Sequence, residues 1–408
     1  MKRPVDPSTA AARSGLARGT TGDGNDLIAP ISLASVRAYA DIPSVDEAGE
    51  GRSSYRRYGG GNPAQLEAVL ADLETVPGRQ APLARVTASG QAALLLAATL
   101  VVTPSRRRVV VVRPCYGGTE PLLSAPLGNL GLRVSTVDLP VHGGDHGELV
   151  SAALGDDVAA VVTEVITNPL IGLVDVPAVA EAAHRCGAVC IVDSTFATPV
   201  LFQPFAHGAD LVLHSLTKHL SGHSDVLGGV LLVDTASECS DWLDSHARLL
   251  GTNLSPFDAW LALRGVRTVG LRIERSTRNA IALATFFSSR RELAAVHYPG
   301  MHGPEEAARV ARLLPRGCGA MLSIDLHGGR AAADAFIRGL DNVPLAPSLG
   351  DVATTVSHPA STSHRALSPQ QRAALGIGDG LVRISIGIEH IDDLTAEFDA
   401  ALSAATAR

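Results

Sequence analysis

Between residues 85 and 235, short β-branched runs alternate with alanine-rich stretches, and this alternation constrains the fold most strongly. Several runs are apolar at every position, which is typical of strands in a parallel sheet that is covered on both faces. The intervening segments have helical patterns, and one of them, 176–187, ends in a helix-stopping glycine. The pattern predicts an α/β fold with a mostly parallel sheet. The expected strands are 108–112, 132–139, 158–164, 188–193, 209–215 and 228–233.

The pattern of apolar and polar residues changes after residue 255, where long helical stretches with fewer strands begin. We therefore expect a large domain over 56–255 and a smaller C-terminal α+β domain over 256–408. Residues 1–55 contain no continuous apolar core and do not resemble a secretory signal. This segment is expected to form an arm that contacts a partner.

Composition excludes several classes of protein. The net charge of −7 provides no basic footprint for nucleic acid or an anionic membrane. The longest apolar run, 92–102, is too short to span a bilayer. Five cysteines form no CxxC motif and are too sparse for a disulfide scaffold. We therefore expect a cytoplasmic protein with no nucleic-acid or membrane partner.

Polar side chains end several of the expected strands, and open α/β sheets bind ligands beyond the carboxyl ends of their strands. They are Glu164, Asp193 and the segment from Ser215 to Lys218. Alone, Asp193 could cap a helix or bind a metal, and Lys218 could be a surface lysine. Together they suit a cofactor with an aldehyde and a basic ring nitrogen, because an amine forms a Schiff base and a carboxylate holds the ring protonated. An ion pair at about 4 Å contributes roughly 4 kcal/mol at an effective dielectric of ~20.

A phosphate on such a cofactor would need hydroxyls and backbone amides. Ser89, Gly90 and Gln91 open an apolar helix, and a helix N-terminus binds anions, although an ordinary N-cap has the same sequence pattern. Tyr116 lies on a glycine-flanked loop after the strand at 108–112. It could stack on a planar cofactor or be a packing tyrosine.

The segment 193–229, DSTFATPVLFQPFAHGADLVLHSLTKHLSGHSDVLGG, resembles the pyridoxal-phosphate signature of the Cys/Met metabolism enzymes. This family includes cystathionine γ-synthase, cystathionine γ-lyase, methionine γ-lyase and O-acetylhomoserine sulfhydrylase. The resemblance implies the type I, aminotransferase-like fold, pyridoxal 5'-phosphate as cofactor and an amino acid as substrate. It extends over nearly the whole chain, through NPAQLEAVLADLE (62–74), SGQAA, YGGT, SPFDAWLALRG, HYPG, HPASTSH and GLVRISIGIE (380–389).

The resemblance also implies a role for each candidate residue. Lys218 and Tyr116 would be catalytic: the lysine would bind the cofactor and move protons, and the tyrosine would stack on the ring and assist the leaving group. Asp193 would pair with the ring nitrogen. Arg383 and Ser348 would clamp the substrate α-carboxylate. The set is completed by Asn168 beside that carboxylate and by the cofactor-binding residues Tyr55, Arg57, Ser89, Gly90, Gln91, Thr195, Ser215 and Thr217.

In this family a Tyr-x-Arg pair reaches the phosphate from the neighbouring subunit, and Tyr55 and Arg57 match that pair. The resemblance thus implies a homo-oligomer, a tetramer built from dimers with shared active sites, in which the arm 1–55 contacts a neighbour. Here Tyr58 and three glycines, 59–61, separate the arginine from the Asn-Pro pair, so the loop is longer than in most members.

Position 353 is a second departure from the family pattern. The cystathionine enzymes tend to carry a glutamate shortly after a Ser-Leu-Gly, and in SLGDVATTVSHP the matching residue is Ala353. Without that carboxylate, the distal ammonium of cystathionine would be unpaired. A buried unpaired ammonium weakens binding by kilocalories per mole rather than by tenths of a kilocalorie per mole. The SLGD form is closer to the methionine γ-lyase and sulfhydrylase branches.

Two further polar clusters have weaker functional readings. Glycine-rich polar loops such as HGGDHGE (142–148) are usually solvated, so we expect no metal there. Three histidines near Lys218 are expected to support the site or pack around it. The possible ligands of the loop are His142, Asp145, His146 and Glu148, and the three histidines are His214, His219 and His223.

The sequence thus predicts γ-elimination or γ-replacement on a γ-substituted L-amino acid: a homoserine ester, a methionine-like thioether or a specialised analogue. Two alternatives remain open at this stage. One is cystathionine γ-synthase or γ-lyase proper, and the other is a catalytically silent member that only binds pyridoxal phosphate.

Overall fold

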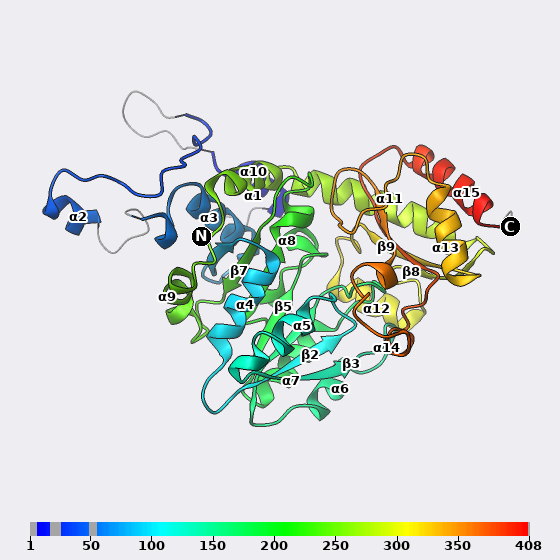
Figure 1. Ribbon diagram of the computed structural model, residues 1–408, viewed down its shortest axis with the longest axis horizontal. Coiled ribbons are helices and arrows are strands. Elements are labelled where there is room, and N and C mark those ends of the chain that lie inside the picture. The colour runs from blue at the N-terminus through cyan, green and yellow to red at the C-terminus, as the bar shows by residue number, and fades with distance from the viewer. Residues whose placement is uncertain (1–5, 17–25, 49–54, 407–408) are drawn as a thin grey trace.

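A seven-stranded sheet with strand order β1-β7-β6-β5-β4-β2-β3 forms the large domain. The structure, a computed structural model, describes residues 6–16, 26–48 and 55–406. Strands β6, β5, β4, β2 and β3 are parallel, and β7 pairs antiparallel with both β6 and β1. The predicted mostly parallel sheet is therefore confirmed (Figure 1). The strands are β1 (Leu83–Thr87), β2 (Arg108–Arg113), β3 (Arg133–Asp138), β4 (Val158–Glu164), β5 (Val189–Asp193), β6 (Leu211–Ser215) and β7 (Gly229–Val233).

Both faces of this sheet are buried, as the continuous apolar runs indicate. In β6, Leu211 and Leu213 belong to one apolar cluster and Val212 to the other. Helix α4 packs on β6 and β7, whereas α7 packs on β4 and β5 and α3 packs on β1. The helices of this part are α3 (Gly61–Glu74), α4 (Gly90–Val101), α5 (Thr119–Ser124), α6 (His146–Ala152), α7 (Val176–Arg185), α8 (Thr198–Leu201) and α9 (Ser240–Leu250).

Strand β1 is the sheet member that the sequence pattern did not predict. Arg85 interrupts its apolar run, and a charged residue argues against a buried strand. The guanidinium is nevertheless buried, because it pairs with Glu67 of α3 at 3.1 Å and with Asp244 of α9. The pairing with two carboxylates is a tertiary contact that local pattern cannot reveal.

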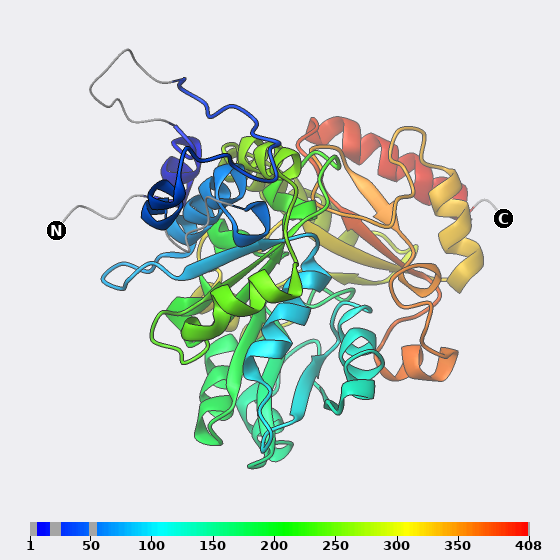
Figure 2. The same ribbon diagram turned by 60° about the vertical axis from the view of Figure 1, so that its left-hand side comes forward.

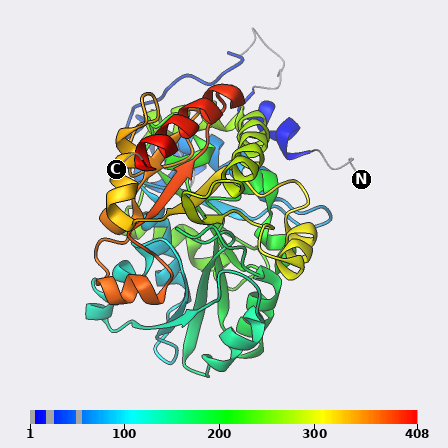
Figure 3. The same cartoon turned by 90° about the vertical axis from the view of Figure 1, so that its right-hand side faces the viewer.

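The C-terminal domain contains a separate antiparallel sheet with strand order β10-β11-β9-β8. Figure 3 shows this domain, coloured yellow to red, above the large domain. Helix α10 packs against α3, so the first element after the predicted boundary lies on the large domain. The strands are β8 (Leu293–His297), β9 (Met321–Leu326), β10 (Thr355–Ser357) and β11 (Leu381–Ser385), and the helices are α10 (Pro256–Val266), α11 (Val269–Ser288), α12 (Pro304–Leu313), α13 (Gly329–Arg338), α14 (Pro369–Ala374) and α15 (Ile391–Thr406).

The N-terminal arm lies at the end of the molecule opposite the C-terminus (Figures 1 and 2). Its first helix, α1 (Pro7–Ala12), packs against α3 and α11 of its own chain. Further along, Asn62 donates a hydrogen bond to the Pro30 carbonyl at 3.0 Å, whereas Leu27, Leu33 and Val36 are exposed. Helix α2 (Ile42–Ala48) projects from the body. In the described ranges, no helix combines the length and apolar character needed to cross a bilayer.

Candidate active site

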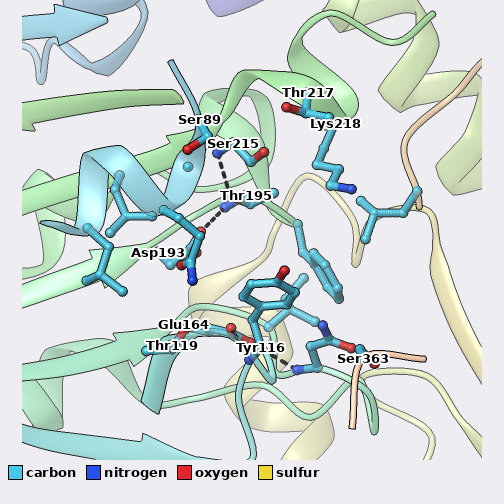
Figure 4. A pocket seen from close by; sticks show the side chains of 18 of the residues that line it. Ser89, Tyr116, Thr119, Glu164, Asp193, Thr195, Ser215, Thr217, Lys218 and Ser363 are labelled. Carbon is cyan, nitrogen blue, oxygen red and sulfur yellow. Dashed lines mark hydrogen bonds between the residues drawn. The ribbon is translucent and has the colours of Figure 1, made fainter. Parts of the chain in front are cut away.

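A cavity of about 220 Å³ lies at the carboxyl ends of β4, β5 and β6, where the C-terminal domain closes over the large sheet. This is the position at which open α/β sheets bind ligands. Eleven of the fourteen predicted site residues line the cavity: Ser89, Gly90, Gln91, Tyr116, Asn168, Asp193, Thr195, Ser215, Thr217, Lys218 and Arg383. Figure 4 shows Lys218, Tyr116 and Asp193 pointing into the same space from different elements.

Two carboxylates end adjacent strands at the base of the cavity. Glu164 of β4 and Asp193 of β5 are register partners, and both line the cavity. Burial, and after it the charge of Asp193, raise the pKa of Glu164 well above its ordinary value. Burial also raises the pKa of Asp193, although hydrogen bonds from Thr195, including 2.8 Å from its backbone N–H, oppose the shift. A protonated ring nitrogen beside Asp193 would offset this cost of burial.

Lys218 follows β6 in a single π-helical turn, Leu216–Leu220, and its own backbone departs from helical geometry at φ −100° and ψ −138°. Such turns occur frequently at functional sites. The ammonium donates to the Ser348 hydroxyl at 3.0 Å. Burial, and next the nearby Arg383 guanidinium, lower the pKa of Lys218 to about 8. The amine therefore loses its proton more readily than an ordinary lysine, as a nucleophile or base requires.

Arg272 of α11 holds this turn in place, although the sequence did not identify it. Its guanidinium donates to the carbonyls of Leu220 and Gly265 at 3.2 and 2.8 Å and also to the His219 carbonyl. Burial lowers the pKa of the guanidinium to about 10. The side chain also explains Gly222, because a Cβ there would lie 2.1 Å from the Arg272 Nη1 atom.

We expect Arg272→Met to lower the free energy of unfolding by about 3 kcal/mol, because three buried carbonyls lose their donor. Cofactor retention should fall with it, since the turn carries Lys218. Thermal and chemical denaturation measure the first effect and cofactor absorbance the second. The control is Arg278→Met on the same helix, which removes an exposed ion pair with Glu274 at 2.6 Å. This variant should lower the free energy of unfolding by less than roughly 0.5 kcal/mol. Equal stability of the two variants would contradict the role of Arg272.

The N-terminus of α4 forms the end of the cavity suited to a phosphate. Ser89 caps the helix by accepting from the Ala92 N–H at 3.1 Å, and Ser215 and Thr217 add hydroxyls. A Cβ on Gly90 would lie 3.2 Å from the Ser215 Cβ, so glycine leaves room between helix and strand. Thr217 also closes its loop by accepting from the Gly228 N–H at 3.0 Å.

The Tyr116 loop is held from three directions. The Tyr116 N–H donates to Glu164 at 2.6 Å, and the Gln91 amide donates to the Gly118 carbonyl at 2.8 Å. Gly117 is required because a Cβ there would lie 1.8 Å from the Ser363 carbonyl of the C-terminal domain. Tyr116 is 44% exposed, and its ring forms one wall of the cavity.

Arg383 of β11 is a buried cation on the C-terminal wall. It donates to the Asn168 side-chain oxygen at 2.8 Å and to the Ser348 carbonyl at 3.2 Å. Its Nε is buried and has no hydrogen-bond partner among the described residues. Burial lowers the pKa of the guanidinium to about 10. A substrate carboxylate would accept from the unpaired donor and pair with the buried guanidinium.

Tyr55 and Arg57 do not line this cavity. The Arg57 guanidinium donates to the Arg248 carbonyl at 2.7 Å and lies 5.4 Å from the ring centre of Tyr55. Gly59, Gly60 and Gly61 all have positive φ, which explains the three glycines of the extended loop. Tyr55 is exposed and Arg57 is half-buried, and neither reaches the cavity of its own chain.

The sequence left three polar cavity-lining residues without a role: Glu164, Thr119 and Ser363. Glu164 carries the same signal as Asp193, a carboxylate that ends an apolar strand. Ser363 comes from the C-terminal domain, and no local pattern links it to the large-domain residues. Ala353 is exposed and does not line the cavity.

The histidines near Lys218 also lie outside the lining. His214 instead contacts Glu74 at 2.7 Å, with both side chains buried.

The residues present fit pyridoxal 5'-phosphate. The cavity combines a helix N-terminus with hydroxyls at one end, a buried carboxylate on the base and a partly neutral lysine in one wall. Arg383 retains an unpaired donor for a substrate beside it. Each feature meets one group of the cofactor or of an amino acid bound to it.

Comparison with known proteins agrees with this geometry. The model of the Cys/Met metabolism PLP-dependent enzyme family matches residues 8–403. The chain is 38% identical to an L-methionine gamma-lyase of Brevibacterium sandarakinum over 84% of this chain and 81% of that one. It is 36% identical to the O-succinylhomoserine sulfhydrylase of Pseudomonas aeruginosa over 97% and 95%. A solved cystathionine gamma synthase from Xanthomonas oryzae pv. oryzae, in complex with cystathionine, superposes with a TM-score of 0.89 at 37% identity, covering 99% and 100%.

Proposed function

The chain belongs to the Cys/Met metabolism PLP-dependent enzyme family and eliminates or replaces a γ-substituent of an amino acid, and we propose that this substituent carries no cationic amine. The matching substrates are homoserine esters, methionine-like thioethers or specialised analogues. A catalytically silent role does not agree with a cavity that contains the complete catalytic and binding set: Lys218, Asp193, Tyr116 and Arg383.

One observation carries the proposal about the substituent. Among the described residues that line the cavity, only Glu164 and Asp193 bear carboxylates, and both are committed at its base. Ala353, which matches the glutamate of the cystathionine enzymes, offers a methyl group. The distal ammonium of cystathionine would thus have no anionic partner in the chain that binds it. Moving an unpaired charge out of water costs free energy and would weaken binding.

The chain's own residues divide the work of the reaction. Arg383 and Asn168 hold the α-carboxylate, and Ser348 orients the Lys218 amine. The neutral amine removes the proton at substrate Cα and returns it to another carbon, while the Tyr116 hydroxyl lies where a leaving group departs. The bound cofactor supplies the electron sink that stabilises negative charge at Cα and Cβ.

A substrate comparison tests the proposal. We expect wild type to have a higher kcat/KM for O-acetylhomoserine or methionine than for cystathionine, and Ala353→Glu to shift the ratio toward cystathionine by about tenfold, because position 353 is partly screened by water. The control is Ala331→Glu, which adds the same charge at an exposed position on α13. A wild type that prefers cystathionine would overturn the proposal.

The assembly is part of the same proposal. Exposed apolar side chains on α9 and α10 suit a subunit contact, because patches of this kind mark interfaces; they are Trp242, Leu249, Leu250 and Phe257. The predicted tetramer with shared sites would cover them. A cytoplasmic location stays a prediction that the five free cysteines agree with.

A further inference from the structure

Three histidines, with a glutamate beside one of them, converge where the large and C-terminal domains meet, and none of the four lines the active-site cavity. His142 follows β3, His297 ends β8, His302 lies in the next turn, and Glu306 is in the first turn of α12. One ring nitrogen from each histidine lies within 4.8 Å of the others. The Nδ1 atom of His142 is 3.5 Å from the Oε1 atom of Glu306.

These side chains share an unusual feature: each has a buried polar atom without a partner. Among the described residues, no hydrogen bond reaches His142 Nδ1, His297 Nδ1, His302 Nε2 or Glu306 Oε1. The Glu306 side chain is 2% exposed, and its other oxygen is held by the His302 N–H at 3.0 Å. Buried polar atoms are nearly always paired. His142 Nδ1 and Glu306 Oε1 make only a long contact of 3.5 Å with each other, and the unpaired atoms of His297 and His302 beside them indicate a missing common partner.

The four side chains are of types that bind metals in proteins. A neutral imidazole and an ionised carboxylate are the forms in which histidine and glutamate bind a cation.

We propose that His142, His297, His302 and Glu306 bind one divalent transition-metal ion, and that Zn²⁺ is the ion this donor set favours. Three imidazoles and a carboxylate match tetrahedral zinc, whose metal–ligand bonds of ~2.0–2.2 Å place the ligand atoms roughly 3.3 Å apart. The His142–Glu306 separation of 3.5 Å is already close to this value. The three histidine nitrogens lie within 4.8 Å of one another and need to move closer, and the stacked His142 and His302 rings, 3.6 Å apart at their centres, need to turn toward the ion. Calcium and magnesium prefer oxygen ligands.

The ion would connect the two domains. His142 belongs to the large domain, whereas the other three ligands belong to β8, the turn after it and α12. In the same region, Arg309 of α12 donates to the Gly144 carbonyl at 2.8 Å and contacts His146 at 3.1 Å (α12 and α6 in Figure 1). Four protein ligands leave no open position, so the site is structural rather than catalytic.

The proposed ligand set differs from the loop 142–148 considered in the sequence. His146 uses both ring nitrogens, one beside the Gly143 carbonyl at 3.2 Å and one to accept from the Asp175 N–H at 3.0 Å. Asp145 caps α6 by accepting from the Glu148 N–H at 2.9 Å. Only His142 of that loop joins the new cluster, and its partners lie 155 to 164 residues further along the chain.

The test uses the holoenzyme after chelator treatment, titrated with ZnCl₂ and, as a spectroscopic substitute, CoCl₂. We expect one ion per chain, a higher Tm with Zn²⁺ and the intense visible absorption of tetrahedral Co²⁺. His142→Ala and His302→Ala should each weaken binding by at least roughly 100-fold, because loss of an outer-shell contact alone costs 10–100-fold. The matched control is His390→Ala, whose side chain is 64% exposed.

Circular dichroism and cofactor absorbance verify that each variant is folded. Wild type that binds no ion overturns the proposal whether or not the variants fold. Unchanged binding in both histidine variants also overturns it, because the ion would then be held elsewhere, for instance by the cofactor.

Discussion

Replacement of Lys218 by alanine is expected to lower kcat by at least about 10⁴-fold, because the variant loses the group that moves the substrate protons. The fold should persist, since the proposed phosphate-binding residues, Ser89 to Gln91 with Ser215 and Thr217, are unchanged. The visible absorbance of lysine-bound cofactor should disappear, while fluorescence titration should still detect cofactor binding. Steady-state turnover and absorbance measure the two effects.

The chain provides a clean control for this experiment. Its only other lysine is Lys2, so borohydride reduction of the wild type followed by peptide mass mapping has few possible targets. We expect the reduced adduct on the peptide that contains Lys218, and an added small primary amine should restore part of the activity of Lys218→Ala. Turnover by the variant without added amine would rule out Lys218 as the catalytic base.

Much of the fold could be predicted because its signals are local. Short β-branched runs, several of them apolar at every position, predicted six of the seven strands of the large sheet. Because ligands bind beyond the carboxyl ends of such strands, Asp193 and Lys218 were expected to share one site. Strand β1 was missed because its Arg85 is buried only by pairing with distant carboxylates. Local pattern describes what one segment can bury, but not which charges another segment supplies.

The active site likewise contains some residues that local pattern predicts and some contacts that it does not. Asp193 and Lys218 are each recognisable within a short stretch, whereas the bond from Arg383 to Asn168 joins residues 215 positions apart. The four orphan atoms of the proposed zinc site come from both domains and become visible only when these are packed together. Contacts between distant segments, rather than weak local signals, account for what the sequence did not predict.

The contribution of Tyr55 and Arg57 is the part of the site that one chain cannot complete. Among the described residues that line the cavity, the only cations are Lys218 and Arg383, and both have other roles. A dianionic phosphate bound at α4 therefore lacks a dedicated cation from its own chain. We infer that Arg57 of a neighbouring subunit supplies it, because Tyr55 and Arg57 lie outside the cavity of their own chain.

Co-assembly of two inactive variants tests this inference. In a mixed dimer of Lys218→Ala and Arg57→Ala subunits, one of the two sites receives both intact residues. Random mixing makes half of the dimers mixed, so about a quarter of wild-type activity should return, given that the two sites of a symmetric dimer are equivalent. The measurement is turnover before and after joint refolding or co-expression of differently tagged subunits.

The matched control combines Lys218→Ala with Arg383→Ala. Both side chains line the same chain's cavity, so no mixed dimer contains a complete site and activity should not return. Recovery in both mixtures would mean that exchange or residual activity produced the signal. Recovery in neither, together with a fully active monomer by light scattering, would show that Arg57 acts within its own chain, and the shared site would be wrong.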